Sequence, residues 1–216
     1  MEKKLSNYSL FLFDMDGTLV KFKLDFEYLK RITRKSLEDK GIYLGTIASL
    51  NETLKDLGPF FPNESDYNEF VGTIENIIVK HELETSIKAE AFPDSKELLQ
   101  LLKTKGKKVG IITRNSKAAT IKTLEVSGLN EYIDFVVTRE DVKNPKPNPE
   151  HVEVAIKYVG KNAEDTVVIG DHKYDIYSGK NAGCYTIGVL SGVSSEELLN
   201  EADLVVTSLG EIISFL

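Results

Sequence analysis

The sequence alternates short apolar runs with helical patterns, and this alternation is the feature that most restricts its fold. Continuous apolar runs of this length are typical of strands buried on both faces of a parallel sheet. Six such runs predict strands at residues 8–13, 108–112, 134–137, 166–169, 185–189 and 204–206. Helices are predicted between the later runs, at residues 95–105, 115–127, 149–159 and 174–182. We therefore predict an α/β fold with a doubly wound parallel sheet.

Residues 21–91 interrupt this alternation. Their apolar side chains recur at helical spacing, and no convincing strand pattern occurs among them. We predict a core formed by residues 1–20 and 92–216, with an inserted α-helical cap formed by residues 21–91. We interpret the phenylalanines of the insert mainly as packing residues of a small helical bundle, namely Phe22, Phe26, Phe60, Phe61 and Phe70. An insert beside the ends of parallel strands is well placed to act as a lid.

The composition excludes several classes of function. The 216 residues carry a net charge of −7, which disfavours a nucleic-acid partner or an anionic membrane surface, because both are held by basic side chains. No run approaches the roughly 18 apolar residues that a membrane span needs. The single cysteine, Cys184, excludes an intramolecular disulfide, and we expect a small buried side chain in a cytoplasmic protein. No oligomeric state is indicated.

Carboxylates follow the first and the fourth predicted strands. Asp14 and Asp16 follow the first strand two residues apart, so their side chains leave the sheet on the same side. Asp171 follows the fourth strand, and Asp175 lies near the start of the next helix. Because the carboxyl ends of parallel strands share one edge, we expect these four side chains to gather there. Four carboxylates repel one another unless a cation is present, and oxygen ligands beside a phosphate favour Mg²⁺.

Two other strand ends carry groups suited to an anion. Thr113 follows the second strand, and Arg114 and Asn115 come next at a predicted helix start, a favourable place for phosphate oxygens. After the third strand, Lys146 lies in a loop that contains three of the six prolines in the chain. Prolines restrict the loop, so we predict that Lys146 is held in a defined position.

Taken together, these residues resemble four ordered motifs of the haloacid dehalogenase-like phosphohydrolases. The motif residues are Asp14-Met15-Asp16-Gly17-Thr18, Thr113, Lys146, and Gly170-Asp171 with Asp175. The helical insert resembles the cap of the phosphoglycolate-phosphatase-like branch, and the resemblance covers essentially the whole chain. It implies a Rossmann-like core with a helical cap.

The resemblance also implies a role for each motif residue. Asp14 is expected to be the nucleophile that forms an aspartyl-phosphate, and Asp16 the general acid and then the general base. Thr113 and Lys146 are expected to stabilise charge on the transferring phosphoryl oxygens. Mg²⁺ is expected to bind the carboxylates of Asp14 and Asp171 and the backbone carbonyl of Asp16, with Asp175 acting through water or Lys146.

Further candidate residues lie at or beside the motifs. Gly17 and Thr18 are expected to donate backbone N–H groups to the substrate, and Arg114 and Asn115 are further candidates for substrate binding. Arg114 replaces a more common motif residue and faces either substrate or solvent. We expect His172 to lie behind the metal ligands or at the surface. His81 and His151 are interpreted as structural or solvated.

We therefore predict a Mg²⁺-dependent phosphatase for a small phosphate monoester, such as a phosphoglycolate-like molecule or a sugar phosphate. Asp16, Asp171 and Asp175 favour phosphoryl chemistry over carbon–halogen cleavage. Alternatives within the same superfamily are a nucleotidase, a phosphomutase and a phosphonate hydrolase. The alternative from another class is a phospho-acceptor signalling module of the receiver type, but such modules are shorter and lack a helical insert.

Overall fold

The computed structural model describes residues 4–21, 24–47, 50–192 and 195–216. The chain divides into two compact units. The core unit comprises Met1–Phe22 and Ser86–Leu216, and the insert unit comprises Lys23–Thr85. The insert unit thus lies within the segment that the sequence predicts as a helical cap.

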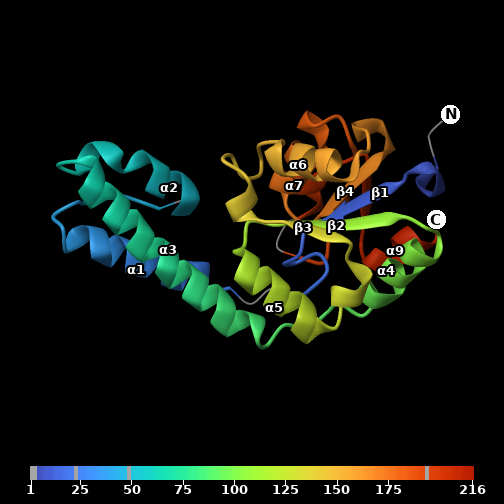
Figure 1. Ribbon diagram of the computed structural model, residues 1–216, viewed down its shortest axis with the longest axis horizontal. Coiled ribbons are helices and arrows are strands. Elements are labelled where there is room, and N and C mark those ends of the chain that lie inside the picture. Colours follow the sequence, from blue (N-terminus) through green and yellow to red (C-terminus); the bar gives the residue numbers. More distant parts are fainter. Residues whose placement is uncertain (1–3, 22–23, 48–49, 193–194) are drawn as a thin grey trace. The chain divides into compact units, whose positions relative to one another are not determined.

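The core unit is built on a parallel sheet in the order β3-β2-β1-β4-β5-β6 (Figure 1). All six predicted strands are present, and the first begins two residues later than expected. The strands are β1 (Leu10–Phe13), β2 (Lys108–Ile112), β3 (Phe135–Val137), β4 (Thr166–Gly170), β5 (Tyr185–Val189) and β6 (Leu204–Val206). The predicted doubly wound α/β fold is confirmed.

The four helices predicted for the core unit are also present, each within two residues of its expected bounds. They are α4 (Ser95–Thr104), α5 (Lys117–Ser127), α6 (Glu150–Val159) and α7 (Lys173–Asn181). The core unit also contains two short helices, α8 (Glu196–Leu199) and α9 (Leu209–Ile213). The insert unit contains α1 (Phe26–Glu38), α2 (Leu50–Asp56) and most of α3 (Glu64–Ser86).

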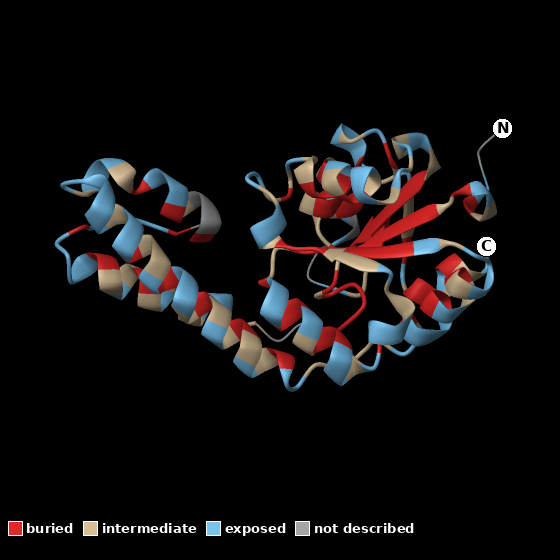
Figure 2. Cartoon of the chain, in the orientation of Figure 1, coloured by how far each residue is buried: buried red, intermediate tan, exposed pale blue. Residues whose placement is uncertain are grey.

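The sheet is buried on both faces, as the continuous apolar strands require (Figure 2). Successive side chains of β1 point to opposite faces. Phe11 and Phe13 pack in a cluster that includes residues of α4, α5 and α9, whereas Leu10 and Leu12 pack in a second cluster that includes residues of α6. Cys184 belongs to the second cluster, and burial raises the pKa of its thiol to about 12, so the expected buried position is confirmed.

In this strand order, β1 lies between β2 and β4 at the point where the order reverses. The chain runs outward from β1 in one direction to β2 and β3, and in the other direction to β4, β5 and β6. Such a reversal of strand order leaves a crevice at the carboxyl ends of the strands. Asp14 follows β1, Thr113 follows β2 and Asp171 follows β4, so these three residues meet at the reversal.

The insert unit has its own apolar core, which contains residues of all three of its helices, among them Leu29, Leu54 and Ile74. Phe70 is buried in this core and Phe61 packs against it, with the two ring centroids 5.2 Å apart. The expectation that the phenylalanines of the insert serve mainly in packing is wrong for Phe26 and Phe60, which are 44% and 55% exposed. Both begin or end a helical segment at the surface of the unit. Phe22 lies outside the described residues.

Backbone hydrogen bonds join the two chain segments that flank the insert. The N–H of Lys21 donates to the carbonyl of Glu90 (2.8 Å), and the N–H of Phe92 donates to the carbonyl of Leu19 (3.0 Å). The hydroxyl of Ser95 also donates to Leu19 (2.7 Å). The core unit therefore fixes both ends of the insertion close together, next to the loop that follows β1.

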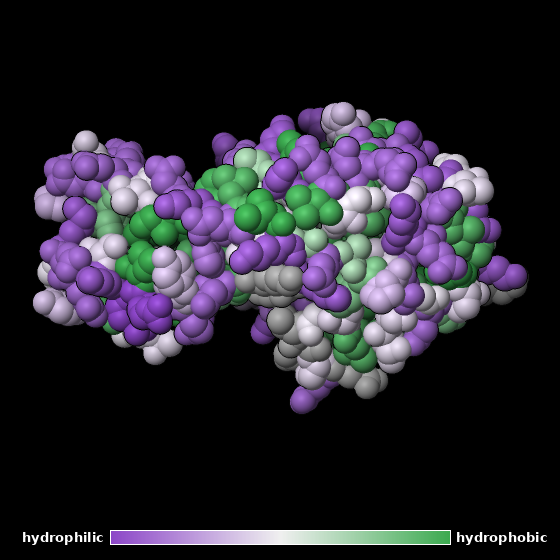
Figure 3. All heavy atoms as spheres, turned by 90° about the horizontal axis from the view of Figure 1, so that it is seen from below, coloured by the Kyte–Doolittle hydropathy of each residue, from purple (hydrophilic) through white to green (hydrophobic). Residues whose placement is uncertain are grey.

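In Figure 3 hydrophilic residues cover most of the visible face, with smaller apolar groups between them. Among the described residues, no helix combines the length and the apolar character that crossing a membrane demands.

His151 is fully buried near the start of α6, which resolves the sequence alternatives in favour of a structural position. Burial, together with the positive charge of Lys146, lowers the pKa of its imidazole to about 4. The folded state therefore disfavours the imidazolium form.

We predict that His151 makes the protein less stable in acid. As the pH falls from about 6.5 to about 4, the unfolded chain binds a proton at this position that the folded chain does not, which lowers the free energy of unfolding by up to about 3 kcal/mol. The measurement is urea unfolding of the wild type and of His151→Leu across this pH range. The free energy of unfolding of the wild type, minus that of His151→Leu, should fall by this amount as the pH falls. A difference that does not change with pH would contradict the prediction.

Candidate active site

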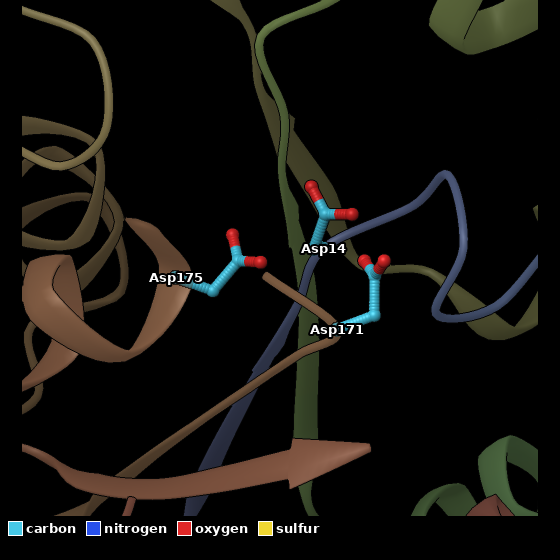
Figure 4. Close-up of side chains that lie close together, drawn as sticks. All are labelled: Asp14, Asp171 and Asp175. Atoms are coloured by element: carbon cyan, nitrogen blue, oxygen red, sulfur yellow. The ribbon is translucent and has the colours of Figure 1, made fainter. Parts of the chain in front are cut away.

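Three carboxylates converge at the carboxyl ends of the central strands (Figure 4). Asp14 follows β1, Asp171 follows β4, and Asp175 faces them from the first turn of α7. One carboxylate oxygen from each residue lies within 4.8 Å of the other two. Asp171 and Asp175 are buried, and the side chain of Asp14 is 13% exposed. The structure thus brings together three of the four carboxylates that the sequence assigned to a metal.

Lys146 enters this cluster from the proline-rich loop. Its Nζ donates to Asp14 Oδ1 (2.6 Å), to Asp175 Oδ1 (2.5 Å) and to the backbone carbonyl of Ile112 (3.0 Å). These acceptors account for all three ammonium protons. The side chain is only 2% exposed, so Lys146 is held in a defined position between two carboxylates, as the surrounding prolines indicated.

The charges of the cluster do not balance. Burial alone would lower the pKa of Lys146, but the charges of Asp14 and Asp175 raise it above the ordinary value, so the ammonium stays protonated. Burial raises the pKa of Asp14 well above its ordinary value, and the charges of Asp175 and Asp171 add to this effect while Lys146 opposes it. Three carboxylates against one ammonium leave an excess of negative charge. This oxygen-rich, buried donor set fits a hard divalent cation.

Two glycines allow other loops to approach Asp171 closely. Gly17 has a φ of +87°, which favours glycine, and a Cβ at Gly17 or at Gly192 would overlap the Asp171 carboxylate. Thr18 Oγ1 donates to Asp171 Oδ1 (3.2 Å), and Ser191 Oγ donates to the carbonyl of Gly17 (2.7 Å). The loop after β1 and the loop after β5 therefore enclose Asp171 from two directions.

The sequence interpretation missed Ser191 and Gly192. Both follow β5, whose carboxyl end lies at the same edge of the sheet as those of β1 and β4. That position was the available signal, because loops at this edge form the ligand site of a doubly wound fold.

Gly17 and Thr18 differ in geometry from the expected role as amide donors to substrate. The N–H of Gly17 donates to the carbonyl of Val20 (2.8 Å), and the N–H of Thr18 donates to the carbonyl of Met15 (3.3 Å). Both N–H groups are therefore already hydrogen-bonded within the turn that follows β1. The two residues instead contact the carboxylate of Asp171, as described above.

The segment after β2 contacts Asp16. Thr113 is buried, and its hydroxyl accepts a hydrogen bond from the N–H of Asn115 (3.2 Å). The side-chain amide of Asn115 donates to Asp16 Oδ2. Among the described residues, the carboxylate of Asp16 is therefore oriented by Asn115 and is not a member of the group around Lys146.

His172 caps α7. The Nδ1 atom of its imidazole accepts a hydrogen bond from the backbone N–H of Tyr174 (3.2 Å), and the backbone N–H of His172 donates to Asp175 Oδ2 (3.0 Å). Burial lowers the pKa of His172, which favours the neutral form that can accept this bond. His172 thus lies behind Asp175, in agreement with the first of the positions that the sequence left open. The histidine of the insert, His81, packs on Tyr28 with ring centroids 5.0 Å apart.

Arg114 extends toward α7. Its guanidinium carbon lies 5.6 Å from the ring centroid of Tyr174, and the carbonyl of Arg114 accepts a hydrogen bond from the guanidinium of Arg139 (2.9 Å). The side chain is neither fully buried nor fully exposed. Arg114 is therefore held over an aromatic ring beside Asp175.

Comparison with known proteins places this arrangement in a family. The family model of the haloacid dehalogenase-like hydrolases matches residues 11–189, a range that includes every residue of the carboxylate cluster. The chain belongs to the haloacid dehalogenase-like hydrolases. The predicted family and the hydrolase class of the enzyme are thereby confirmed, in place of the receiver-type alternative.

Relatives of similar length align with most of this chain. A protein named pyrophosphatase PpaX from Bacillus cereus is 30% identical over 184 residues, which cover 82% of this chain and 81% of the relative. The protein of the same name from Bacillus pumilus is 29% identical over 206 residues, or 90% of this chain and 88% of the relative.

Solved structures show the same fold. A hydrolase from Pseudomonas syringae has a TM-score of 0.72 at 24% identity, with 95% of this chain and 96% of that chain covered. A haloacid dehalogenase-like family protein from Streptococcus pneumoniae has a TM-score of 0.66 at 17% identity, with 97% and 99% covered.

We predict that Lys146→Met destabilises the protein by about 3–5 kcal/mol, because it leaves two buried carboxylates without their shared cation. The control is Lys180→Met, which removes a more exposed ion pair with Asp203 (3.2 Å) and should cost less than about 1 kcal/mol. Chemical unfolding at neutral pH without divalent cations measures both. Similar losses for the two variants would show that Lys146 does not balance the cluster.

Proposed function

We propose that this protein is a Mg²⁺-dependent phosphatase that hydrolyses a small phosphorylated molecule through phosphorylation of Asp14. The observation that carries the proposal is the position of the Lys146 ammonium between Asp14 and Asp175, whose carboxylates cluster with that of Asp171. This arrangement holds a carboxylate nucleophile next to groups that attract a phosphate. Family membership supports the hydrolytic outcome.

In the proposed reaction, each site residue has a distinct role. Asp14 attacks phosphorus, the bond to the leaving oxygen breaks, and the carboxylate becomes an acyl phosphate. Asp16, oriented by Asn115, donates a proton to the leaving oxygen and later accepts a proton from the water that hydrolyses the acyl phosphate. Lys146 and Thr113 stabilise negative charge on the phosphoryl oxygens.

The proposed metal ligands are the carboxylates of Asp14 and Asp171 and the backbone carbonyl of Asp16, with Asp175 acting through water or through Lys146. When bound, Mg²⁺ supplies positive charge that offsets the repulsion between these carboxylates and the incoming phosphate. The buried excess of carboxylate charge and the close approach of Gly17 and Gly192 to Asp171 support this assignment.

The proposed partner is a small phosphorylated metabolite, since the net charge of −7 gives no general attraction for nucleic acids or anionic membranes. The sequence favours a phosphate monoester, such as a phosphoglycolate-like molecule or a sugar phosphate. Because relatives are named pyrophosphatase PpaX, inorganic pyrophosphate should also be included among the substrates tested. A nucleotidase, a phosphomutase and a phosphonate hydrolase are tested by including their substrates in the same panel.

We predict that the purified protein hydrolyses p-nitrophenyl phosphate and members of this panel in Mg²⁺ but not after removal of Mg²⁺ with a chelator. Ca²⁺ should inhibit, because its larger and more flexible coordination shell disturbs the positions of nucleophile and phosphate. Asp14→Asn should lower kcat by at least about a thousandfold, because an amide is a far weaker nucleophile than a carboxylate.

The controls for this assay separate chemistry from folding. Thermal unfolding should show that Asp14→Asn remains folded, and hydroxylamine should release phosphate from the phosphorylated wild type but find none on the variant. Equal turnover with Mg²⁺ and chelator, or wild-type rates in Asp14→Asn, would contradict the proposal.

A further inference from the structure

Two cations share one aromatic side chain beside the carboxylate cluster. The guanidinium of Arg114 lies 5.6 Å from the ring centroid of Tyr174, and the ammonium of Lys173 lies 5.9 Å from the same centroid. Tyr174 also contacts the imidazole of His172, with ring centroids 4.5 Å apart and an interplanar angle of 77°. The aromatic ring is therefore held in place while it supports two positive charges.

The contact between Arg114 and Tyr174 joins the two segments that flank β1. Arg114 follows Thr113 at the end of β2, and Tyr174 precedes Asp175 after β4. Because β2 and β4 are the two neighbours of β1, the contact connects the segments on either side of the strand that ends at Asp14. The Arg114 and Lys173 side chains therefore lie at the same edge of the sheet as the proposed nucleophile.

Arg114 and Lys173 differ from Lys146 in their partners. The Lys146 ammonium already donates hydrogen bonds to Asp14, to Asp175 and to a backbone carbonyl. Among the residues that the structure describes, no carboxylate lies within ion-pair distance of Arg114 or Lys173. A guanidinium that lies over a ring keeps its N–H groups available for an anion, and the contact with the ring reduces the conformational entropy that binding would cost.

We propose that Arg114, held on Tyr174 and assisted by Lys173, binds a second acidic group of the substrate next to the phosphate that Asp14 attacks. The inference rests on the proposed phosphatase function and narrows its substrate class to small molecules with two anionic groups. The second group is a phosphate or a carboxylate, since both accept paired hydrogen bonds from a guanidinium. Tyr174 is a positioning residue for Arg114 and Lys173.

The test compares substrates that differ only in the second group. Phosphoglycolate is paired with 2-hydroxyethyl phosphate, in which a hydroxymethyl group replaces the carboxylate. Pyrophosphate is paired with methyl phosphate. For each substrate, kcat/KM of a variant is divided by kcat/KM of the wild type, so that differences in intrinsic reactivity cancel.

We predict that Arg114→Gln lowers kcat/KM at least about tenfold for the preferred substrate with two anionic groups, and less than about threefold for its singly anionic partner. Tyr174→Leu should produce the same selective loss in smaller measure, whereas Tyr174→Phe, which keeps the aromatic ring, should not. A selective loss with phosphoglycolate identifies a carboxylate as the second group, and one with pyrophosphate identifies a phosphate.

The matched control is Lys117→Gln, which removes a positive charge three residues from Arg114 at an exposed position. It should affect both members of each pair equally. Inhibition of p-nitrophenyl phosphate hydrolysis by methylenediphosphonate, compared with methylphosphonate, gives a second readout, and Arg114→Gln should weaken only the former.

Equal losses on both members of each pair, or no loss on either, would overturn the inference and leave the phosphatase proposal intact. Absence of Mg²⁺-dependent turnover in the wild type would instead refute the proposed function and the inference with it. Thermal unfolding of Arg114→Gln shows whether any change in rate has a folding cause.

Discussion

The buried ammonium of Lys146 is the interaction on which the rest of the site depends. It joins Asp14 to Asp175 and reaches the backbone of β2 through the carbonyl of Ile112. A lysine so deeply buried stays charged only because the two carboxylates raise its pKa. The same carboxylates are tolerable together only because the ammonium lies between them. With Asp171, three carboxylates face one ammonium, and this excess of negative charge is the physical reason for proposing a divalent cation.

The fold supplies the positions that this interaction needs. Parallel strands deliver Asp14, Thr113 and Asp171 to one edge of the sheet, and the reversal of strand order at β1 leaves room for a ligand there. Apolar layers on both faces of the sheet fix the strand ends. The short helix cap at His172 then directs Asp175 toward Lys146. Rigid elements thus hold the reacting groups, and the loops between them set the remaining contacts.

Most of the fold and of the carboxylate cluster could be predicted from the sequence, because periodicity and strand-end position are local properties. The six strands and the convergence of Asp14, Asp171 and Asp175 follow from them. Contacts between loops could not be predicted from the sequence. Neither the approach of Gly192 to Asp171 nor the position of Arg114 over the ring of Tyr174 leaves a periodic signal in the sequence. The exposure of Phe60 was also not predicted, because the sequence around an apolar residue in a turn does not show whether its side chain packs against the core.

Calorimetric titration with Mg²⁺ tests the central claim, that the excess buried charge is balanced by a divalent cation. The account predicts that each folded chain binds a single Mg²⁺ and that Asp171→Asn weakens this binding more than about tenfold while the protein remains folded. Because burial and neighbouring charges raise the pKa of Asp14, binding should also release protons, which is seen as a dependence of the heat on the buffer. Absence of binding to the wild type, or equal affinity in Asp171→Asn, would contradict the account.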